Sequence, residues 1–386
     1  MKYCDCSVER LLKNEKVKTA RDRVLIERAY NTFMSNMYPA DSDFLWSPYR
    51  CISPGKGGFP GVWNWDTAFH AIGVSRWNTE IAKENIIGFF KFQKENGMLP
   101  DVIFESGACV DTLSKPPVFA WATKIVYERD DDIEFLKEIY PKLVANTAWW
   151  ENERSSDGLF YYDASEPERD DYLQRVKWES GWDNSVRWDK GITEYWAIDL
   201  NCFMVMCYDS LKFLSNELGN SEDATKWRNK SKELKLLINE KMWCKDGYYS
   251  DVNRYTEEIS EVLSPASFMP LYIGIASKEQ AECMRIIAED KNKFNHKMPT
   301  VSFDNPEYSN DYWRGLTWLN VAYFAAKGLK NYGYSVADKI KENILDMCYN
   351  EKRGIFENYD SITGEGHGCE HFSWSCVFII EFVLDF

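Results

Sequence analysis

Apolar residues recur at helical spacing along most of the chain. From Trp196 they follow every three or four residues as far as Leu218, which places them on one face of a helix. A second stripe runs from Ile133 to Leu143. The same period predicts helices at about 8–36, 66–76, 79–95, 117–129, 222–243, 264–274, 278–290, 311–328, 333–348 and 371–384. Strand-like pieces such as 247–252 are short enough for hairpins between these helices.

The helices predict an all-α protein that forms a single domain over residues 1–386. Nothing along the chain reads as a linker, because no segment rich in proline, glycine or serine interrupts the pattern. About twelve helices joined by uneven loops fit helical hairpins arranged in a ring, although a plain bundle or a solenoid gives the same coarse pattern. The lack of a fixed sequence repeat argues against the solenoid.

Charge and cysteine content narrow the partners and the compartment. Lys and Arg number 46 against 61 Asp and Glu, and the net charge of −15 disfavours nucleic acid and membrane surfaces as partners. The eleven cysteines are scattered without a CxxC pair, as expected of reduced thiols in a cytosol. The first 18 residues are charged throughout and lack the apolar core of a signal peptide. We therefore expect a cytoplasmic protein, and the sequence leaves a homo-oligomer open.

Tryptophan is unusually abundant and unevenly placed. Ten of the sixteen tryptophans fall in six short segments, four of which also carry Asp, Glu, Asn or Arg. These segments are 61–66, 76–77, 116–121, 178–188, 313–318 and 372–374. A pyranose ring has an apolar face for stacking and a rim of hydroxyls for carboxylates and amides, so this mixture is typical of a sugar site. The alternative is that these tryptophans fill a helical core.

Hydrolysis of a glycosidic bond requires two carboxyl groups, one of them protonated at the working pH. Asp183 is a candidate acid because Trp178, Trp182 and Trp188 surround it in sequence and apolar rings would raise its pKa. The alternative is an aspartate that caps the following helix through Asn184 and Ser185.

Six segments in one order resemble glycoside hydrolase family 63 and the trehalases. Residues 179–188, ESGWDNSVRW, resemble the motif ESGWD(N/F)SxRW of these enzymes. Five further segments resemble the family's aromatic-Trp-Asp segment, its Asn-Gly-x-(I/L)-Pro loop, its Pro-Pro helix start, its Tyr-Trp-Arg-Gly turn and its C-terminal signature. They are, in order, 63–69, 96–100, 116–121, 312–315 and 356–374.

The resemblance implies an (α/α)6 toroid and an inverting α-glycosidase. It assigns the general acid to Asp183 and the general base to Glu357. We expect the two carboxyl groups to face each other across a pit, about 6.5–9.5 Å apart, with one water between Glu357 and the sugar. No covalent intermediate is expected.

The same resemblance assigns the residues that hold the sugar. Trp65 and Asp66 match the substrate-gripping Trp-Asp pair. The other residues expected to line the pocket or to hold the base are Asn96, Trp121, Trp182, Arg187, Trp313, Arg314 and Glu365. For Arg314 a structural ion pair is an equal alternative.

Lys115 departs from the family pattern, which carries Gln before the Pro-Pro pair. A cation here suggests that the leaving group carries a carboxylate, as in family members that cleave hexosyl-glycerate solutes. The competing explanation is a salt bridge from Lys115 to Asp66 or Glu105.

Other chemistries find little support in the sequence. The segment 367–371, HGCEH, lacks a second Cys/His pair for a tetrahedral metal site, so neither a metal nor a cofactor is expected. His70 lies among apolar residues and is interpreted as a core residue. Two rival hypotheses are an epimerase on the same toroid, which would need a histidine pair, and a non-catalytic sugar-binding protein. The sequence does not distinguish glucose from mannose as the sugar.

Overall fold

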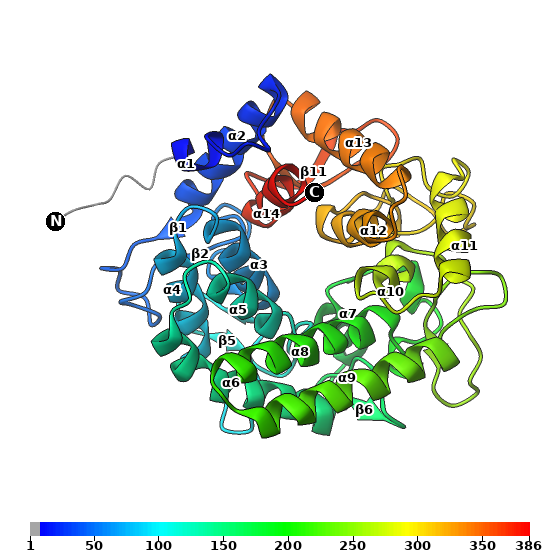
Figure 1. Ribbon diagram of the computed structural model, residues 1–386, viewed down its shortest axis with the longest axis horizontal. Coiled ribbons are helices and arrows are strands. Elements are labelled where there is room, and N and C mark those ends of the chain that lie inside the picture. Colours follow the sequence, from blue (N-terminus) through cyan, green and yellow to red (C-terminus); the bar gives the residue numbers. More distant parts are fainter. Residues whose placement is uncertain (1–7) are drawn as a thin grey trace.

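Six helices form an inner ring, and six others lie outside it (Figure 1). The computed structural model describes residues 8–386. The inner helices are α3 (Asn64–Val74), α5 (Phe119–Tyr127), α8 (Ile198–Glu217), α10 (Met269–Tyr272), α12 (Leu319–Asn331) and α14 (Ser373–Leu384). Each contacts the next, and α14 returns to α3, so the ring is closed.

The outer helices complete the toroid. They are α2 (Ala20–Asn36), α4 (Thr79–Phe90), α6 (Ile133–Glu153), α9 (Ser221–Lys241), α11 (Lys278–Glu289) and α13 (Val336–Asn350). Two short helices, α1 (Val8–Leu12) and α7 (Tyr172–Ser180), lie apart from this pattern. The arrangement is the (α/α)6 toroid that the resemblance implied.

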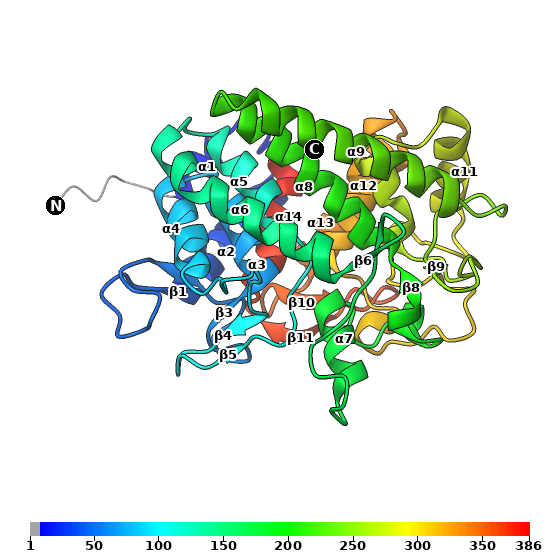
Figure 2. The same cartoon turned by 90° about the horizontal axis from the view of Figure 1, so that it is seen from below.

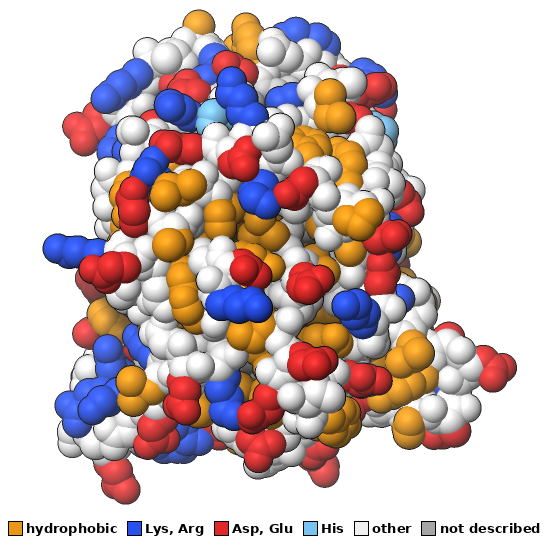
Figure 3. Space-filling model, turned by 90° about the vertical axis from the view of Figure 1, so that its right-hand side faces the viewer, with side chains coloured by type: hydrophobic (Ala, Val, Ile, Leu, Met, Phe, Trp, Pro, Cys, Tyr) orange, Lys and Arg blue, Asp and Glu red, His pale blue; other side chains and the backbone are white. Residues whose placement is uncertain are grey.

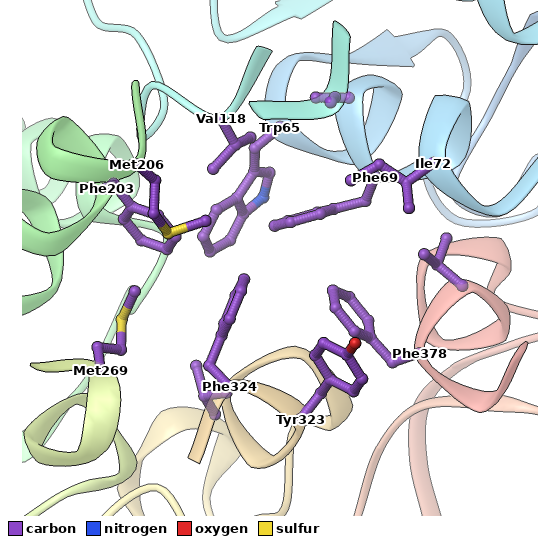
Figure 4. Close-up of a cluster of buried hydrophobic side chains, with 14 of the residues drawn as sticks. Trp65, Phe69, Ile72, Val118, Phe203, Met206, Met269, Tyr323, Phe324 and Phe378 are labelled. Carbon is purple, nitrogen blue, oxygen red and sulfur yellow. The ribbon is translucent and has the colours of Figure 1, made fainter. Parts of the chain in front are cut away.

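Burial explains which helices lie inside. Every residue of α3 and of α14 is buried, as expected for helices covered on all sides. The outer helix α9 buries only one stripe, at three- and four-residue spacing, that includes Trp227, Leu234 and Ile238. The inner helices meet across an apolar cluster in which Trp65, Phe69, Phe203, Met269, Phe324 and Phe378 converge (Figure 4).

Short strands gather mainly at one end of the ring (Figure 2). One small sheet pairs β3 (Val62–Trp63), β4 (Val102–Ile103) and β5 (Cys109–Val110), and a hairpin pairs β10 (Phe356–Tyr359) with β11 (Gly366–Glu370). The remaining strands form two-residue pairs: β1 (Met37–Tyr38) with β2 (Cys51–Ile52), β6 (Ser155–Ser156) with β7 (Leu159–Phe160), and β8 (Tyr195–Trp196) with β9 (Val252–Asn253).

Three helix predictions differ from the structure. The helix predicted over 8–36 is broken, because Thr19 forms a capping box that starts α2 afresh. The helix predicted from 311 begins only at Leu319, since 312–314 form a tight turn. Helix α7 was not predicted. The capping box predicted at Ser277 and Gln280 is present at the start of α11.

The surface of the α11 side mixes acidic, basic and apolar side chains (Figure 3). Within residues 8–386 no helix has the length and hydropathy needed to cross a membrane. The nine cysteines in this part of the chain are free thiols, whereas Cys4 and Cys6 lie outside the described residues.

Candidate active site

A small pocket at the hairpin end of the ring collects four charged side chains. Asp66, Lys115, Asp183 and Glu357 line it. The inner helices α3 and α14 both begin at this pocket, which we call the pit. Asp183 and Glu357, predicted as acid and base, are 174 positions apart in sequence, and the ring closure brings them to one cavity.

Aromatic rings make up most of the remaining wall of the pit. The wall includes Phe59, Trp63, Trp65, Tyr312, Trp313, Trp318, Phe372 and Trp374. Trp313 and Trp318 stack with ring centroids 3.9 Å apart, and Trp374 lies against Trp65 at 5.1 Å. Such flat apolar walls beside carboxylates suit a sugar ring.

The turn that carries Asp183 is fixed from two sides. Gly181 ends α7 in the left-handed conformation, with φ of 72°, and a Cβ there would lie 2.4 Å from the Trp65 ring. On the other side, the fully buried carboxylate of Glu179 binds the guanidinium of Arg154 and accepts hydrogen bonds from the Ser114 and Asp163 amides. Gly181 and Glu179 therefore hold in place the turn that carries Asp183.

Asp183 does not cap a helix. Ser185 accepts the hydrogen bond from the Arg187 amide and caps the following turn, which leaves the Asp183 carboxyl to the pit. Burial raises the pKa of Asp183, while the nearby ammonium of Lys115 opposes that rise. A raised pKa is what a general acid needs, because the group must carry a proton near neutral pH.

Glu357 lies where the β10–β11 ladder is irregular. The pairing shifts between Phe356 and Asn358, and such bulges re-aim a side chain. The Tyr312 hydroxyl donates to Glu357 Oε1 at 2.7 Å, and the Cys369 amide donates to Oε2 at 3.0 Å. Position 368 has room only for glycine, since a Cβ there would lie 2.4 Å from Glu357 Oε2.

Opposing influences act on the protonation of Glu357. Burial raises its pKa, whereas the hydrogen bonds from Tyr312 and from the Cys369 amide lower it by stabilising the carboxylate. These donors favour the ionised form, which a general base requires.

Two further buried carboxyl groups surround Lys115. Burial raises the pKa of Asp66 to about 7 and that of Asp101 to about 6, with Lys115 opposing both shifts. The Lys115 ammonium lies 3.4 Å from Asp101 and donates to the Trp178 carbonyl. The predicted alternative partners were Asp66 and Glu105; Glu105 instead accepts from the Tyr38 hydroxyl.

Two of the predicted tryptophans do not line the pit. Trp182 is buried behind it, between Trp313 at 4.9 Å and the guanidinium of Arg187. Trp121 lies on a second cavity, with Arg76, Arg129 and Glu381. Arg76 follows α3 and Glu381 lies in the last turn of α14, the two inner helices that begin at the pit, so this cavity is at the opposite end of the ring.

Both predicted arginines are held by acids outside the pit. Arg187 is buried and bonds to Asp199 and Asp251, with closest distances of 2.7 Å to each. Arg314 forms a bidentate pair with Asp189 at 2.8 Å. The structure therefore favours the ion-pair alternative for Arg314 and corrects the pocket placement of Arg187.

Asn96 and Glu365 are also corrected. Asn96 is exposed, and its side chain accepts from the Met98 amide in a turn that Gly97 closes with φ of 92°. The Glu365 side chain is 62% exposed and lies 3.6 Å from Arg353. The segments that carry Asn96 and Glu365 form loops, and neither side chain lines the pit.

Tyr312 is the functional residue that the sequence analysis missed. Its segment matched the Tyr-Trp-Arg-Gly turn, but a motif does not show that a hydroxyl meets a carboxylate 45 positions away. His70 is buried as predicted, and its Nε2 lies 2.8 Å from Ser373 Oγ.

The described residues contain one group of three candidate metal ligands, Glu80, Asp130 and Asp132, and all three bind the ammonium of Lys83. The His and Cys side chains of 367–371 form no such group within residues 8–386.

The fold and the pit define a class of protein. An (α/α)6 toroid with carboxyl groups in an aromatic pit is typical of glycoside hydrolases. The family model for the mannosylglycerate hydrolase MGH1-like glycoside hydrolase domain matches residues 59–375. The chain belongs to this family, and the resemblance to glycoside hydrolase family 63 is confirmed.

Individual relatives agree with this assignment. The mannosylglycerate hydrolase of a Thermus thermophilus strain is 25% identical over 406 residues, covering 83% of this chain and 94% of the relative. A crystal structure of GH63 mannosylglycerate hydrolase from Thermus thermophilus in complex with Tris and D-glycerate superposes with a TM-score of 0.78 at 23% identity, covering 92% of this chain and 99% of that one.

A more distant structure shares the fold alone. Neutral trehalase Nth1 from Saccharomyces cerevisiae has a TM-score of 0.69 at 19% identity, over 87% of this chain and 73% of that one.

Proposed function

We propose that the protein is an inverting α-glycosidase that hydrolyses a small α-linked glycoside, with Asp183 as general acid and Glu357 as general base. The observation that carries this proposal is the pit itself, where both carboxyl groups line one aromatic pocket together with Asp66. Asp183 donates its proton to the glycosidic oxygen as the bond to the anomeric carbon breaks. Glu357 takes a proton from the water that attacks the opposite face of that carbon.

The remaining pit residues position the sugar. Asp66 lies in the first turn of α3 and faces the cavity, where its carboxyl group binds sugar hydroxyls. The rings of Trp65, Trp313 and Trp374 form the apolar wall on which the sugar stacks.

Neither rival hypothesis gains support from the pit. An epimerase of the kind considered above needs a histidine pair, and none of the residues lining the pit is a histidine. A sugar-binding protein needs the aromatic wall but has no use for an acid and a base on one cavity.

Hydrolysis of a substrate panel tests the proposal. The panel contains trehalose, kojibiose, nigerose, α-glucosylglycerate and α-mannosylglycerate, with released hexose as the readout. We expect turnover of at least one member. The absence of hexose release from every member, by protein whose circular dichroism shows a folded helical chain, would contradict it.

A second, more specific candidate is a hydrolase of hexosyl-glycerates, in which Lys115 binds the carboxylate of the aglycone. Of the described residues that line the pit, Lys115 alone is a cation. Its ammonium has three donors, of which one meets the Trp178 carbonyl and one points to Asp101 at 3.4 Å. The third donor is available to a ligand. The related Thermus structure was obtained with D-glycerate.

The Lys115→Gln variant tests this assignment with a matched pair of substrates, a hexosyl-glycerate and the corresponding neutral hexosyl-glycerol. We expect kcat/KM to fall about 10- to 100-fold for the glycerate only, the size of a lost hydrogen bond to a charged group. Lys56→Gln is the control, because Lys56 binds the Met37 carbonyl outside the pit. An equal fall in kcat/KM on both substrates would show that Lys115 does not bind the carboxylate of the aglycone and acts only as the partner of Asp101.

We also infer a cytoplasmic location for the enzyme. The nine cysteines within residues 8–386 are free thiols, most of them buried, which is typical of a reducing compartment. Fractionation of the native cells with an antibody to the protein would test this.

A further inference from the structure

The acid-bearing turn and the base are connected through a third segment, the turn Asp311–Arg314. Next to Asp183, the Asn184 side chain accepts from the Trp313 amide at 2.8 Å and donates to the Asp311 carboxylate at 3.0 Å. Between these two residues, the Tyr312 hydroxyl donates to Glu357 Oε1 at 2.7 Å. Asn184 is therefore hydrogen-bonded to the residues on both sides of Tyr312, and Tyr312 is hydrogen-bonded to Glu357, so the turn connects the residue after Asp183 with the base.

Additional contacts keep the two turns together. The Arg314 guanidinium donates to the Asn184 carbonyl at 3.2 Å while it pairs with Asp189. The rings of Trp182 and Trp313 pack with centroids 4.9 Å apart. Side chains on both sides of Asp183 thus contact the turn 311–314.

The conformation of Tyr312 indicates that its position is imposed. Its φ is 51°, in the left-handed region that bulky side chains rarely adopt unless their surroundings hold them there. Trp318 holds it, because the indole Nε1 donates to the Tyr312 carbonyl at 3.2 Å and the two rings pack at 5.0 Å. This conformation turns the phenol toward Glu357.

We propose that the turn Asp311–Arg314 is a brace that sets the position of Glu357 relative to Asp183, with Asn184 and Tyr312 as its positioning residues. The proposal rests on the proposed roles of Asp183 and Glu357. An inverting enzyme must keep its two carboxyl groups far enough apart for one water and must aim the base at that water. A glutamate on a bulged strand has three rotatable bonds, so its aim depends on what holds its oxygens.

The brace also affects the charge of the base. Glu357 faces the carboxyl groups of Asp66 and Asp183, which disfavour its ionisation, and lies near the thiol of Cys369. Tyr312 and the Cys369 amide are the donors that favour ionisation. Loss of the phenol hydroxyl therefore weakens both the aim of the carboxylate and its ionised state.

The experiment compares Tyr312→Phe, Asn184→Ala and the double variant on α-glucosylglycerate and α-mannosylglycerate. For Tyr312→Phe we expect kcat to fall about 10- to 100-fold with KM within about twofold, because a hydrogen bond to a charged group is lost. The acidic limb of the kcat/KM profile should move to higher pH, since the carboxylate is less stabilised. A purely structural role would not move this limb.

Asn184→Ala should lower kcat about 3- to 10-fold. The double variant should be about as active as Tyr312→Phe alone, because Asn184 acts on the base through Tyr312. Asn184→Asp provides a second test that keeps side-chain size but repels Asp311, and it should resemble Asn184→Ala. Tyr308→Phe is the matched control, since the Tyr308 hydroxyl donates to Asn310 in the same loop and does not contact Glu357.

An unchanged kcat and pH profile in Tyr312→Phe would overturn the brace, and so would losses that multiply in the double variant. A loss in Tyr308→Phe as large as in Tyr312→Phe would also overturn it. Failure of the proposed function is distinguishable, because it would appear as turnover by Asp183→Asn or Glu357→Gln.

Discussion

The two ends of the ring use the same kinds of residue in different ways. At the pit, Asp66, Asp183 and Glu357 face one cavity with only Lys115 as a cation. At the opposite end, Glu381 pairs with Arg76 at 2.9 and 2.5 Å and lies 3.6 Å from Arg129. Trp121 lines that second cavity as Trp65 lines the first.

The difference between the two ends is charge pairing. Two guanidinium groups, those of Arg76 and Arg129, compensate the charge of the Glu381 carboxylate. At the pit no arginine within residues 8–386 compensates the acids, and burial raises the pKa values of Asp66, Asp183 and Glu357 above their ordinary values. Unpaired buried acids mark a site of chemistry more reliably than the residue mixture alone.

Replacement of the acid or the base should have the largest effect. We expect Asp183→Asn and Glu357→Gln each to lower kcat by about 10²- to 10⁴-fold, because each removes one proton transfer. Glycoside hydrolysis by the purified variants measures this, and circular dichroism checks that they are folded.

Glu381→Gln is the matched change at the opposite end of the ring. It should keep kcat within about twofold while lowering stability, since it leaves two arginines short of a partner. Comparable losses of kcat at both ends would contradict the distinction between them.

Arg187→Met should have the next largest effect, on stability. The Arg187 side chain is 1% exposed and neutralises Asp199 and Asp251, which are equally buried. Removing it leaves two uncompensated charges and should lower the free energy of unfolding by about 3–5 kcal/mol. Urea denaturation measures this. A stability loss below about 1 kcal/mol, or a KM that rises in a still stable variant, would restore Arg187 to the substrate site.

Asp66→Asn should have a smaller effect that depends on pH. The pKa of Asp66 is raised to about 7, so the folded state holds this proton more tightly than the unfolded chain does. Its contribution to stability is therefore present below about pH 4 and is lost as pH rises through about 7. Asparagine does not ionise, so the variant should be more stable than the parent at pH 8 by about 1 kcal/mol or more, and the two should converge near pH 4.

Thermal unfolding at both pH values measures this difference. The same variant should lose activity, because Asp66 faces the pit. A variant that is less stable than the parent at pH 8 would show that the Asp66 carboxylate is well compensated by Lys115.

Much of the fold was predictable from local patterns. The spacing of apolar residues located most helices, since the buried positions of a helix recur every three or four residues in the sequence. The breaks were harder: Thr19 restarts a helix through its cap, and residues 312–314 form a turn inside a helical pattern. Closure of the ring came from the motif resemblance, because periodicity does not show which helices meet.

Site residues could be predicted where the local backbone conformation alone directs the side chain toward the pit. Asp183 and Glu357 lie on a glycine-ended turn and a bulge, so their motifs and their positions agree. Arg187 and Trp121 lie in equally good motifs, but their surroundings come from distant segments. The contact between Tyr312 and Glu357 is also long-range. The roles of these three residues depend on contacts with segments far away in the sequence, and the sequence does not show which distant segments meet.

The central claim is single-step inversion by Asp183 and Glu357, and the anomeric form of the first product tests it most directly. Proton NMR can follow hydrolysis of α-glucosylglycerate or α-mannosylglycerate, whose leaving group is not a sugar, before mutarotation equilibrates the released hexose. Inversion at an α-linkage predicts that the β-anomer appears first. Initial release of the α-anomer would contradict the account, because it would require two displacements and a covalent intermediate.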